Sequence, residues 1–356
     1  MAADKKLVIV TDAWHPQVNG VVRTLAKCCE LMKERGYEVI VISPKDYRSA
    51  PCPTYPEIRL ALTRPSTVRQ RLVKLKPDYV HIATEGPLGF MARRACLKMG
   101  WSFTTSFHTR FPEYLRDRVP IPPKWTYAFL RRFHNAASHT LVPTQSIIDD
   151  LQGRGFTGLE LWTRGVDRKL FHPRDKLAKQ WPKPVFICVG RVATEKNLPA
   201  FLELELPGTM LIVGDGPELD DLKGRFPKAH FVGKKEGEDL ARIYASADVF
   251  VFPSRTDTFG LVLLEAIASG LPVAAFPVPG SSDVVGTTGA GILSEDLQAA
   301  CLAALNMPAF DPAEVLKNFT WEACADIFEN VLSSTKSVAQ TMRYPDNQPQ
   351  TTASGG

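Results

Sequence analysis

The stretch PSRTDTFGLVLLEAIASGLPV, residues 253–273, joins a polar loop to an apolar helical segment. It follows VFVFP (249–253), a short run of β-branched and aromatic residues that predicts a strand. Asp257 and Glu265 lie on either side of Gly260 within the stretch. A strand, a loop and a helix in this order form the repeating unit of a parallel sheet covered by helices.

The start of this expected helix combines capping residues with a poor helix former. Asp257 and Thr258 are favourable N-cap residues, so the helix is expected to begin near Phe259. Gly260 then falls in the first turn, where it costs about 1 kcal/mol relative to alanine. A helix N-terminus presents unpaired N–H groups, so a glycine there favours close approach by a phosphate. Glu265 is either an exposed edge of the helix or an acceptor for the hydroxyl groups of a ligand.

Similar strand and helix patterns recur along the whole chain. In the first half, strands are expected at 7–11, 37–43, 79–84, 102–107 and 139–144, with helices at 20–35 and 87–99. In the second half, strands are expected at 184–190, 209–214, 229–233, 249–253 and 272–276. This alternation predicts two doubly wound α/β domains joined near 165–183. Ligands of open α/β sheets bind at the carboxyl ends of the strands, so we expect the site where the two domains meet.

The composition is that of an ordinary soluble protein. Of 356 residues, 44% are hydrophobic and 23% are charged. The seven cysteines include no C-x-x-C pair, which indicates reduced thiols in the cytosol rather than a disulfide framework or a zinc site. No apolar run reaches the ~18 residues of a spanning helix, and the N-terminus lacks the pattern of a signal peptide. The expected location is therefore cytoplasmic.

The charge of the chain is unevenly distributed. Residues 1–173 hold 27 Lys and Arg against 15 Asp and Glu, whereas residues 174–356 hold 16 against 23. A basic half beside an acidic half indicates a polyanion or an anionic surface as a partner of the first half. Two ordinary solvated surfaces would give the same counts.

Two further segments follow expected strands in the second half. GRVATEKN (190–197) places Arg191 and Lys196 in a loop, where each could bond to a phosphate or be merely solvated. IVGDGPE (212–218) contains Gly214 in a G-x-G turn that lacks the third glycine of a dinucleotide fingerprint. A nucleotide contact or a plain turn would both explain this glycine.

The first half carries three candidates near strand ends. Gly20 opens a helix, so it could present its N–H to a phosphate or form a plain turn. His108 follows the expected strand at 102–107, and Glu85 follows the one at 79–84. A single histidine is more often structural, but the end of a strand is where a functional one would lie.

The order and spacing of these segments resemble glycosyltransferase family 4, the retaining GT-B enzymes, over about residues 7–333. The most specific match is PSRTDTFGLVLLEAIASGLPV, which is similar to the E-x7-E segment of the family. GRVATEKN, VGDGPE and TRGVDRKLFHP match in the same order.

The resemblance implies an α/β GT-B fold with two doubly wound Rossmann-like domains facing a central cleft. The implied domains are an acceptor-binding domain and a donor-binding domain, at residues 1–168 and 169–319, with a helix at about 320–334 completing the first. The aperiodic segment 335–356 is predicted to be a disordered tail.

The resemblance also implies roles for individual residues. Catalytic roles fall to four side chains, namely His108, Arg191, Lys196 and Asp257. Donor contacts fall to Gly20, Gly214, Val232, Gly233, Phe259, Gly260, Leu261 and Glu265, of which the last would accept the ribose hydroxyls. The acceptor side would include Glu85 and Arg110.

Three positions depart from the common family pattern. Asp257 stands where the family has glutamate, Asn19 precedes Gly20 where a second glycine is common, and Arg164 stands where many members have asparagine. These variants resemble the branch of sulfoquinovosyl- and glucosyl-diacylglycerol synthases and α-mannosyltransferases. This branch implies a UDP-sugar donor, with a GDP-mannose-dependent enzyme acting on phosphatidylinositol or a polysaccharide as the alternative.

The implied reaction is front-side transfer, in which the leaving phosphate takes the proton of the acceptor. Arg191, Lys196 and the helix N-terminus would stabilise charge on that phosphate. No D-x-D motif or His/Cys cluster indicates a metal site. No cofactor is therefore expected beyond the nucleotide-sugar co-substrate.

The acceptor is expected to be a membrane lipid. Residues 64–77 are strongly basic, and residues 109–134 interleave basic and aromatic side chains. Such composition suits a lipid–water interface, although a solvated helix face over an aromatic core would look similar. The expected protein is peripheral at the inner face of the cell membrane, bound to its anionic surface. No nucleic-acid recognition motif is present.

Other functional classes stay open at this stage. A dinucleotide-dependent oxidoreductase would share the doubly wound sheet, but no strand is followed by G-x-G-x-x-G. A non-catalytic polyanion-binding protein would explain the basic half, and a nucleotide-sugar epimerase would share the GT-B architecture without needing an acceptor. The sequence does not indicate an oligomeric state.

Overall fold

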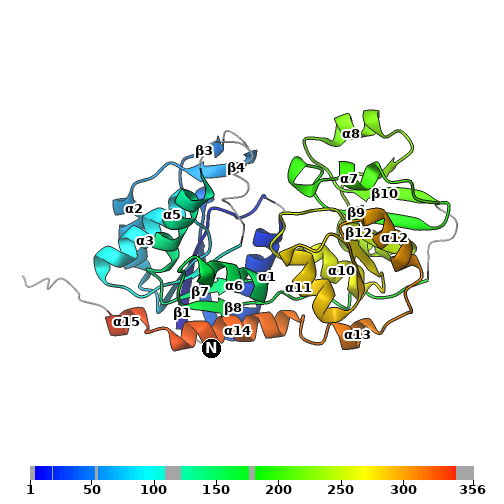
Figure 1. Ribbon diagram of the computed structural model, residues 1–356. Coiled ribbons are helices and arrows are strands. Elements are labelled where there is room, and N and C mark those ends of the chain that lie inside the picture. Colours follow the sequence, from blue (N-terminus) through cyan, green and yellow to red (C-terminus); the bar gives the residue numbers. More distant parts are fainter. Residues whose placement is uncertain (1–4, 18, 53–54, 109–121, 176–180, 342–356) are drawn as a thin grey trace, which may run out of the picture.

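The computed structural model describes residues 5–17, 19–52, 55–108, 122–175 and 181–341, which form two α/β lobes (Figure 1). Each lobe contains a six-stranded sheet whose paired strands run parallel. The strands are built from buried aliphatic runs such as LVIV and VFICV. Burial on both faces is what the helices of a doubly wound fold provide. The predicted fold of two doubly wound domains is confirmed.

The N-terminal lobe has the strand order β2-β1-β5-β6-β7-β8. Its strands are β1 (Lys5–Val10), β2 (Tyr37–Ile42), β5 (Tyr79–Ile82), β6 (Thr104–Ser106), β7 (His139–Val142) and β8 (Leu159–Leu161). Its helices are α1 (Gly20–Glu34), the 3-10 turn η1 (Pro44–Asp46), α2 (Pro65–Leu75), α3 (Pro87–Met99), α5 (Pro123–His134) and α6 (Gln145–Gly153). An antiparallel hairpin of β3 (Ser49–Cys52) and β4 (Tyr55–Ala61), which the sequence patterns did not predict, lies beside the sheet.

The C-terminal lobe has the strand order β11-β10-β9-β12-β13-β14. Its strands are β9 (Val185–Val189), β10 (Thr209–Val213), β11 (His230–Phe231), β12 (Val249–Phe252), β13 (Val273–Ala275) and β14 (Gly291–Leu293). Its helices are the 3-10 turn η2 (Thr194–Lys196), α7 (Pro199–Leu202), α8 (Leu219–Arg225), α9 (Gly237–Ser246), α10 (Leu261–Ala268), α11 (Pro279–Thr288), α12 (Leu297–Leu305) and α13 (Pro312–Val315). This order is that of a dinucleotide-binding Rossmann sheet.

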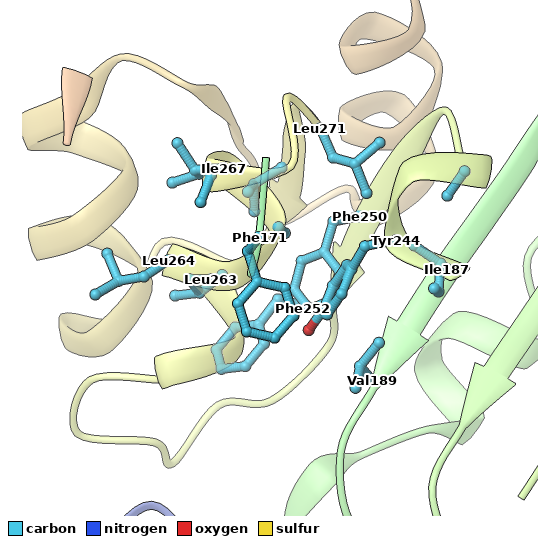
Figure 2. Packing of buried hydrophobic residues seen from close by; sticks show 14 of the residues in the cluster. Phe171, Ile187, Val189, Tyr244, Phe250, Phe252, Leu263, Leu264, Ile267 and Leu271 are labelled. Atoms are coloured by element: carbon cyan, nitrogen blue, oxygen red, sulfur yellow. The ribbon is translucent and has the colours of Figure 1, made fainter. Parts of the chain in front are cut away.

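One of the two buried clusters of the C-terminal lobe joins the sheet to α9 and α10 (Figure 2), and the other joins it to α7, α8 and α12. Phe250 and Phe252 from β12 pack against Leu263 of α10 and Tyr244 of α9. Phe171, from the segment that joins the lobes, contacts Tyr244 edge to face, with ring centroids 5.7 Å apart. The joint is therefore anchored in the C-terminal core.

The chain returns to the N-terminal lobe through α14 (Trp321–Ser334), which runs beneath that lobe in Figure 1. Phe328 and Leu332 of α14 are buried in one cluster with Leu25 of α1 and Leu7 of β1. The indole N–H of Trp162 donates to the Cys324 carbonyl at 2.9 Å. The first lobe is thus completed by the last long helix.

The predicted disordered tail is wrong in its first residues. Residues 335–341 continue the ordered chain and include α15 (Val338–Thr341). Val338 is buried in the N-terminal core, and its N–H donates to the Asp78 carbonyl at 2.9 Å. A single buried valine gives no periodic pattern, so periodicity alone missed this contact. Residues 342–356 lie outside the described residues.

The predicted start of the helix in 253–273 is also wrong by two residues. α10 begins at Leu261, and Gly260 is its N-cap with φ of +79°. A Cβ on Gly260 would lie 2.9 Å from the Phe252 ring, so the position is closed to larger residues by both backbone and packing. Asp257 and Thr258 do not cap the helix, because their side chains bond elsewhere.

The two sheets share one topological feature. In each sheet, the direction in which successive strands are added changes between two central strands. These two strands are β1 and β5 in the first lobe and β9 and β12 in the second. The loops that leave the carboxyl ends of such strands diverge and leave room for a ligand. Four loops therefore define the place to look for a site, namely 11–19, 83–86, 190–197 and 253–260.

Candidate active site

The loops after β9 and β12 bring together two of the predicted catalytic side chains. Lys196 Nζ lies 2.7 and 2.9 Å from the two carboxylate oxygens of Asp257. Arg191, from the same loop as Lys196, lies 3.7 Å from Glu195. The Asp257 and Lys196 side chains are 16% and 26% exposed, so the pair is only partly exposed to solvent beside the carboxyl ends of the central strands. Both cations therefore belong to the one loop that follows the carboxyl end of β9.

Glu265 is buried in α10 and accepts hydrogen bonds from both lobes. Arg23 Nη2 in α1 lies 2.5 Å from Oε1, and the Tyr244 hydroxyl donates to Oε2 at 3.1 Å. Burial raises the pKa of Glu265, whereas the charge and hydrogen bond of Arg23 and the bond from Tyr244 lower it. The carboxylate is thus held in place rather than exposed on the helix edge, which was the other reading of the sequence.

His108 lies at the end of β6 with both ring nitrogens engaged. Arg164, which can only donate, faces Nδ1 at 3.4 Å, and Ser106 Oγ lies 2.9 Å from Nε2. The neutral ring therefore carries its proton on Nε2. Burial lowers the pKa of His108 well below its usual value, and the neighbouring Arg164 adds to this effect. The side chain is neutral at pH 7, so it cannot stabilise developing charge as a cation.

The backbone of His108 faces the other lobe. Thr258, from the loop before α10, donates through Oγ1 to the His108 carbonyl at 2.7 Å. At the start of α1, a Cβ on Gly20 would lie 3.7 Å from the Leu261 side chain. Predicted donor residues from the two lobes, Gly20 and Leu261, are therefore neighbours. The helix N-termini of α1 and α10 meet at this boundary.

The remaining predicted donor residues lie at strand ends of the second sheet. The Gly214 N–H donates to the Gly233 carbonyl at 3.0 Å, and the Val232 N–H donates to the Ile212 carbonyl at 3.1 Å. A Cβ on Gly214 would lie 1.8 Å from the Gly190 carbonyl oxygen, which explains a glycine there without any ligand. Val232 packs on the core of the lobe.

Two predicted residues are not brought into this cluster by described contacts. The Phe259 side chain is buried in the C-terminal core, so only its backbone could face a ligand. Glu85 Oε1 lies 3.0 Å from Nε2 of His134, within the N-terminal lobe. Arg110, the other predicted acceptor-side residue, lies outside the described residues.

The sequence patterns assigned no role to four polar residues around these loops. Arg23 lies one turn after Gly20, so helical spacing could have placed it beside that glycine. Asp12 accepts from the N–H groups of Leu88 and Gly89 at the start of α3. Tyr244 gave no local signal, because its partner Glu265 lies 21 residues further along the chain. Arg164, which the sequence showed only as a departure from the family pattern, is buried, donates to the carbonyls of Trp162 and Thr163 and faces His108.

The arrangement suits an anionic, hydroxyl-rich ligand. It combines two cations, two helix N-termini and one buried carboxylate at the boundary of the lobes. Cations and N–H groups bind phosphate, whereas a carboxylate binds hydroxyls. Within the residues that the structure describes, no three His, Cys, Asp or Glu side chains are grouped as metal ligands would be.

Two family models match the chain. The model described as Glycosyltransferase Family 4 covers residues 18–170, and that described as Glycosyl transferases group 1 covers residues 183–307. Sulfoquinovosyl transferase SQD2 of Arabidopsis thaliana is 34% identical over 75% of this chain, which spans 58% of that relative. A GDP-mannose-dependent alpha-mannosyltransferase of Mycobacterium tuberculosis is 31% identical over 81% of this chain and 83% of that protein.

Solved structures agree on the fold. A sucrose-phosphate synthase from Thermosynechococcus elongatus superposes with a TM-score of 0.74 at 19% identity, covering 93% of this chain and 98% of that chain. Anabaena HepE in complex with UDP gives 0.66 at 16% identity, covering 92% and 100%. Because a sequence relative matches at 31% identity over most of its own length and the fold agrees throughout, this chain belongs to glycosyltransferase family 4 and has the GT-B fold.

Proposed function

We propose that the protein transfers a hexose, with retention, from a UDP-sugar to a membrane lipid such as diacylglycerol. The observation that carries the donor half is the placement of Lys196, Arg191 and buried Glu265 around the switch point of the second sheet. Diphosphate would bind the two cations and the N-terminus of α10, and ribose would bind Glu265. UDP is present in the HepE structure, which has the same fold.

The proposed chemistry needs charge stabilisation rather than a metal ion. Charge develops on the leaving diphosphate as the sugar bond breaks, and fixed donors at that point lower the barrier. Arg191 and Lys196 would supply these donors, and Asp257, beside Lys196, would bind hydroxyls of the sugar. Neutral His108 would orient the sugar from the opposite lobe. The leaving phosphate would accept the proton of the acceptor hydroxyl.

The acceptor half rests on one face of the N-terminal lobe. Five of the seven strongly exposed large hydrophobic residues among those described lie here, in or near α2, α3 and α5, namely Leu62, Val73, Leu97, Trp125 and Phe129. Exposed basic residues lie in or beside the same helices, at Arg64, Lys74, Lys76, Arg94, Lys98, Lys124, Arg131 and Arg132. We call this surface the basic-aromatic face.

Helix α2 packs against α3, and α5 lies next to α3 (Figure 1). The rings of Phe90 in α3 and Phe129 in α5 stack with centroids 4.8 Å apart. Trp125 is 67% exposed, so it is not part of the aromatic core beneath. Exposed apolar side chains on helices that also carry exposed cations suit an anionic lipid surface. No helix in the described residues is long and apolar enough to cross a bilayer.

The names of some relatives of the chain include a lipid. Alpha-monoglucosyldiacylglycerol synthase of Acholeplasma laidlawii is 27% identical over 75% of this chain and 79% of that protein. Together with the basic-aromatic face, this supports a diacylglycerol acceptor and a location at the inner face of the cell membrane.

Direct transfer assays test the proposal. The purified protein would be incubated with diacylglycerol in mixed micelles and with labelled UDP-glucose, UDP-galactose, UDP-glucuronate or GDP-mannose. The proposal expects label in the lipid phase from one UDP-sugar and its loss in Glu265→Ala. Lipid label from GDP-mannose alone would refute the UDP donor. Donor hydrolysis or transfer without lipid label, even with phosphatidylinositol present, would refute the lipid acceptor.

A further inference from the structure

Arg23 is a residue of the N-terminal lobe that forms an ion pair with Glu265 of the C-terminal lobe. It lies in the first turn of α1, three residues after Gly20, and reaches across the boundary to Oε1 at 2.5 Å. The Glu265 side chain is 4% exposed, whereas that of Arg23 is 45% exposed. The ion pair therefore joins a buried acid of one lobe to a half-exposed base of the other.

The second oxygen of Glu265 is held from within its own lobe. The Tyr244 hydroxyl donates to Oε2 at 3.1 Å, and burial raises the pKa of Tyr244 well above its usual value, so this hydroxyl is a permanent donor. The thiol of Cys188 in β9, near Tyr244, is also neutral because burial raises its pKa to about 12. Arg23 is thus the one charged group of the described residues that compensates Glu265.

The hydrogen-bond capacity of Glu265 is only partly used. An ionised carboxylate offers about four acceptor positions, two on each oxygen. Arg23 uses one position on Oε1, and Tyr244 uses one on Oε2. Among the described partners, one position per oxygen is left for other donors. Two neighbouring hydroxyl groups, such as those of a ribose, match this remaining pair.

We propose that Arg23 is a positioning residue for the donor ribose, acting through Glu265 from the opposite lobe. It holds the carboxylate ionised and oriented so that each oxygen receives one ribose hydroxyl. The nucleoside site is consequently complete only when α1 and α10 are together. This inference rests on the proposed nucleotide-sugar function and adds a residue that the sequence motifs did not indicate.

Binding of ribonucleotides and their 2′,3′-dideoxy analogues tests this role. Calorimetry on the full chain would measure UDP, GDP and the two dideoxy diphosphates against wild type, Arg23→Met, Arg23→Lys and Glu265→Gln. Wild type should prefer the ribonucleotide by about a hundredfold or more, because two hydrogen bonds to a charged acceptor are lost in the analogue. Arg23→Met should reduce this preference to about threefold or less, and Arg23→Lys should keep most of it.

The pH dependence gives a second readout. Without Arg23, the charge and hydrogen bond that lower the pKa of Glu265 are lost, so this pKa rises further and the carboxylate takes up a proton at higher pH than in wild type. Ribonucleotide affinity of Arg23→Met should therefore decline between pH 8 and pH 6 more steeply than that of wild type. Glu265→Gln, which has no carboxylate, should show no such difference. Lys27→Met, one turn further along α1, is the matched control because Lys27 pairs with Glu30 in its own helix.

Each outcome decides the inference. An Arg23→Met variant that retains the full preference for ribose overturns it, as does one that weakens ribonucleotide and dideoxy analogue equally. A wild type that binds UDP or GDP without any preference for ribose overturns it while leaving the transferase proposal intact. A wild type that binds neither diphosphate refutes the nucleotide-sugar function, and the inference falls with it.

Discussion

Replacing Lys196 with methionine should strongly reduce donor turnover. In the structure the Lys196 ammonium contacts both oxygens of Asp257, at 2.7 and 2.9 Å. A diphosphate entering at this strand end would receive hydrogen bonds from the same ammonium. The variant removes that donor and also leaves Asp257 without its counter-ion beside an incoming anion.

The expected decrease in kcat/KM follows from the removed hydrogen-bond donor and from the uncompensated charge of Asp257. A hydrogen bond from a charged donor contributes about 1.5–3 kcal/mol, which corresponds to about a tenfold to 150-fold loss in kcat/KM. Repulsion between Asp257 and the diphosphate adds to this loss, because the carboxylate is only 16% exposed and poorly screened. Lys196→Met/Asp257→Asn should therefore recover part of the lost diphosphate affinity, since the asparagine carries no charge.

The assay is release of nucleoside diphosphate from the best labelled donor at saturating acceptor, with UDP affinity measured in parallel. Lys183→Met is the matched control, because Lys183 also pairs with an aspartate, Asp248, but away from the strand carboxyl ends. A Lys196→Met variant within threefold of wild type would refute the assigned role. A double variant that binds UDP no better than Lys196→Met would refute the repulsion argument.

Three further predictions concern stability and membrane binding. Asp12→Ala should lower the free energy of unfolding in urea by about 2–4 kcal/mol, because two buried N–H groups at the start of α3 lose their acceptor. A decrease in that free energy below about 0.5 kcal/mol would contradict this. Burial lowers the pKa of His81 to about 3, so the unfolded state binds a proton first as pH falls below about 6.5, and stability should drop by about 2 kcal/mol between pH 7.5 and pH 5. His81→Gln should lose correspondingly less over that range, and equal losses in both proteins would count against the assignment. Trp125→Ser should weaken binding to anionic vesicles about threefold to tenfold at low salt. Leu302→Ser, which replaces an exposed apolar residue of the other lobe, should leave this binding unchanged. Equal effects of the two substitutions would argue against the basic-aromatic face.

The sheets were predictable because their signal is local. Buried parallel strands appear as short aliphatic runs, and LVIV or VFICV can be recognised without knowing their neighbours. The hairpin at β3 and β4 was not predictable in this way. Its sequence, SAPCPTYPEIRLA, contains three prolines and lacks a typical hairpin turn dipeptide. Edge pairing tolerates proline, so this hairpin depends on tertiary context.

The candidate site was predictable only in part. Strand ends and glycine turns located the loops, but the partners within them depend on how the lobes meet. Glu265 and Arg23 are 242 residues apart, and no local pattern connects them. Aspartate is a favourable N-cap residue, but the side chain of Asp257 forms an ion pair with Lys196 and does not cap the helix. The left-handed backbone of Gly260 then sets the start of α10 instead.

The return of α14 means that the polypeptide passes between the lobes twice. One passage runs from Trp162 to Phe171 and the other from Phe319 to Phe328, and each has one end in either core. The passages touch, because the Val166 N–H donates to the Phe319 carbonyl at 3.2 Å and Gly165 packs on the backbone of Trp321. The two connections between the lobes are therefore one joined structure and not two separate linkers. Any change in the angle between the lobes has to be absorbed at this one place, by a few residues that belong to both passages.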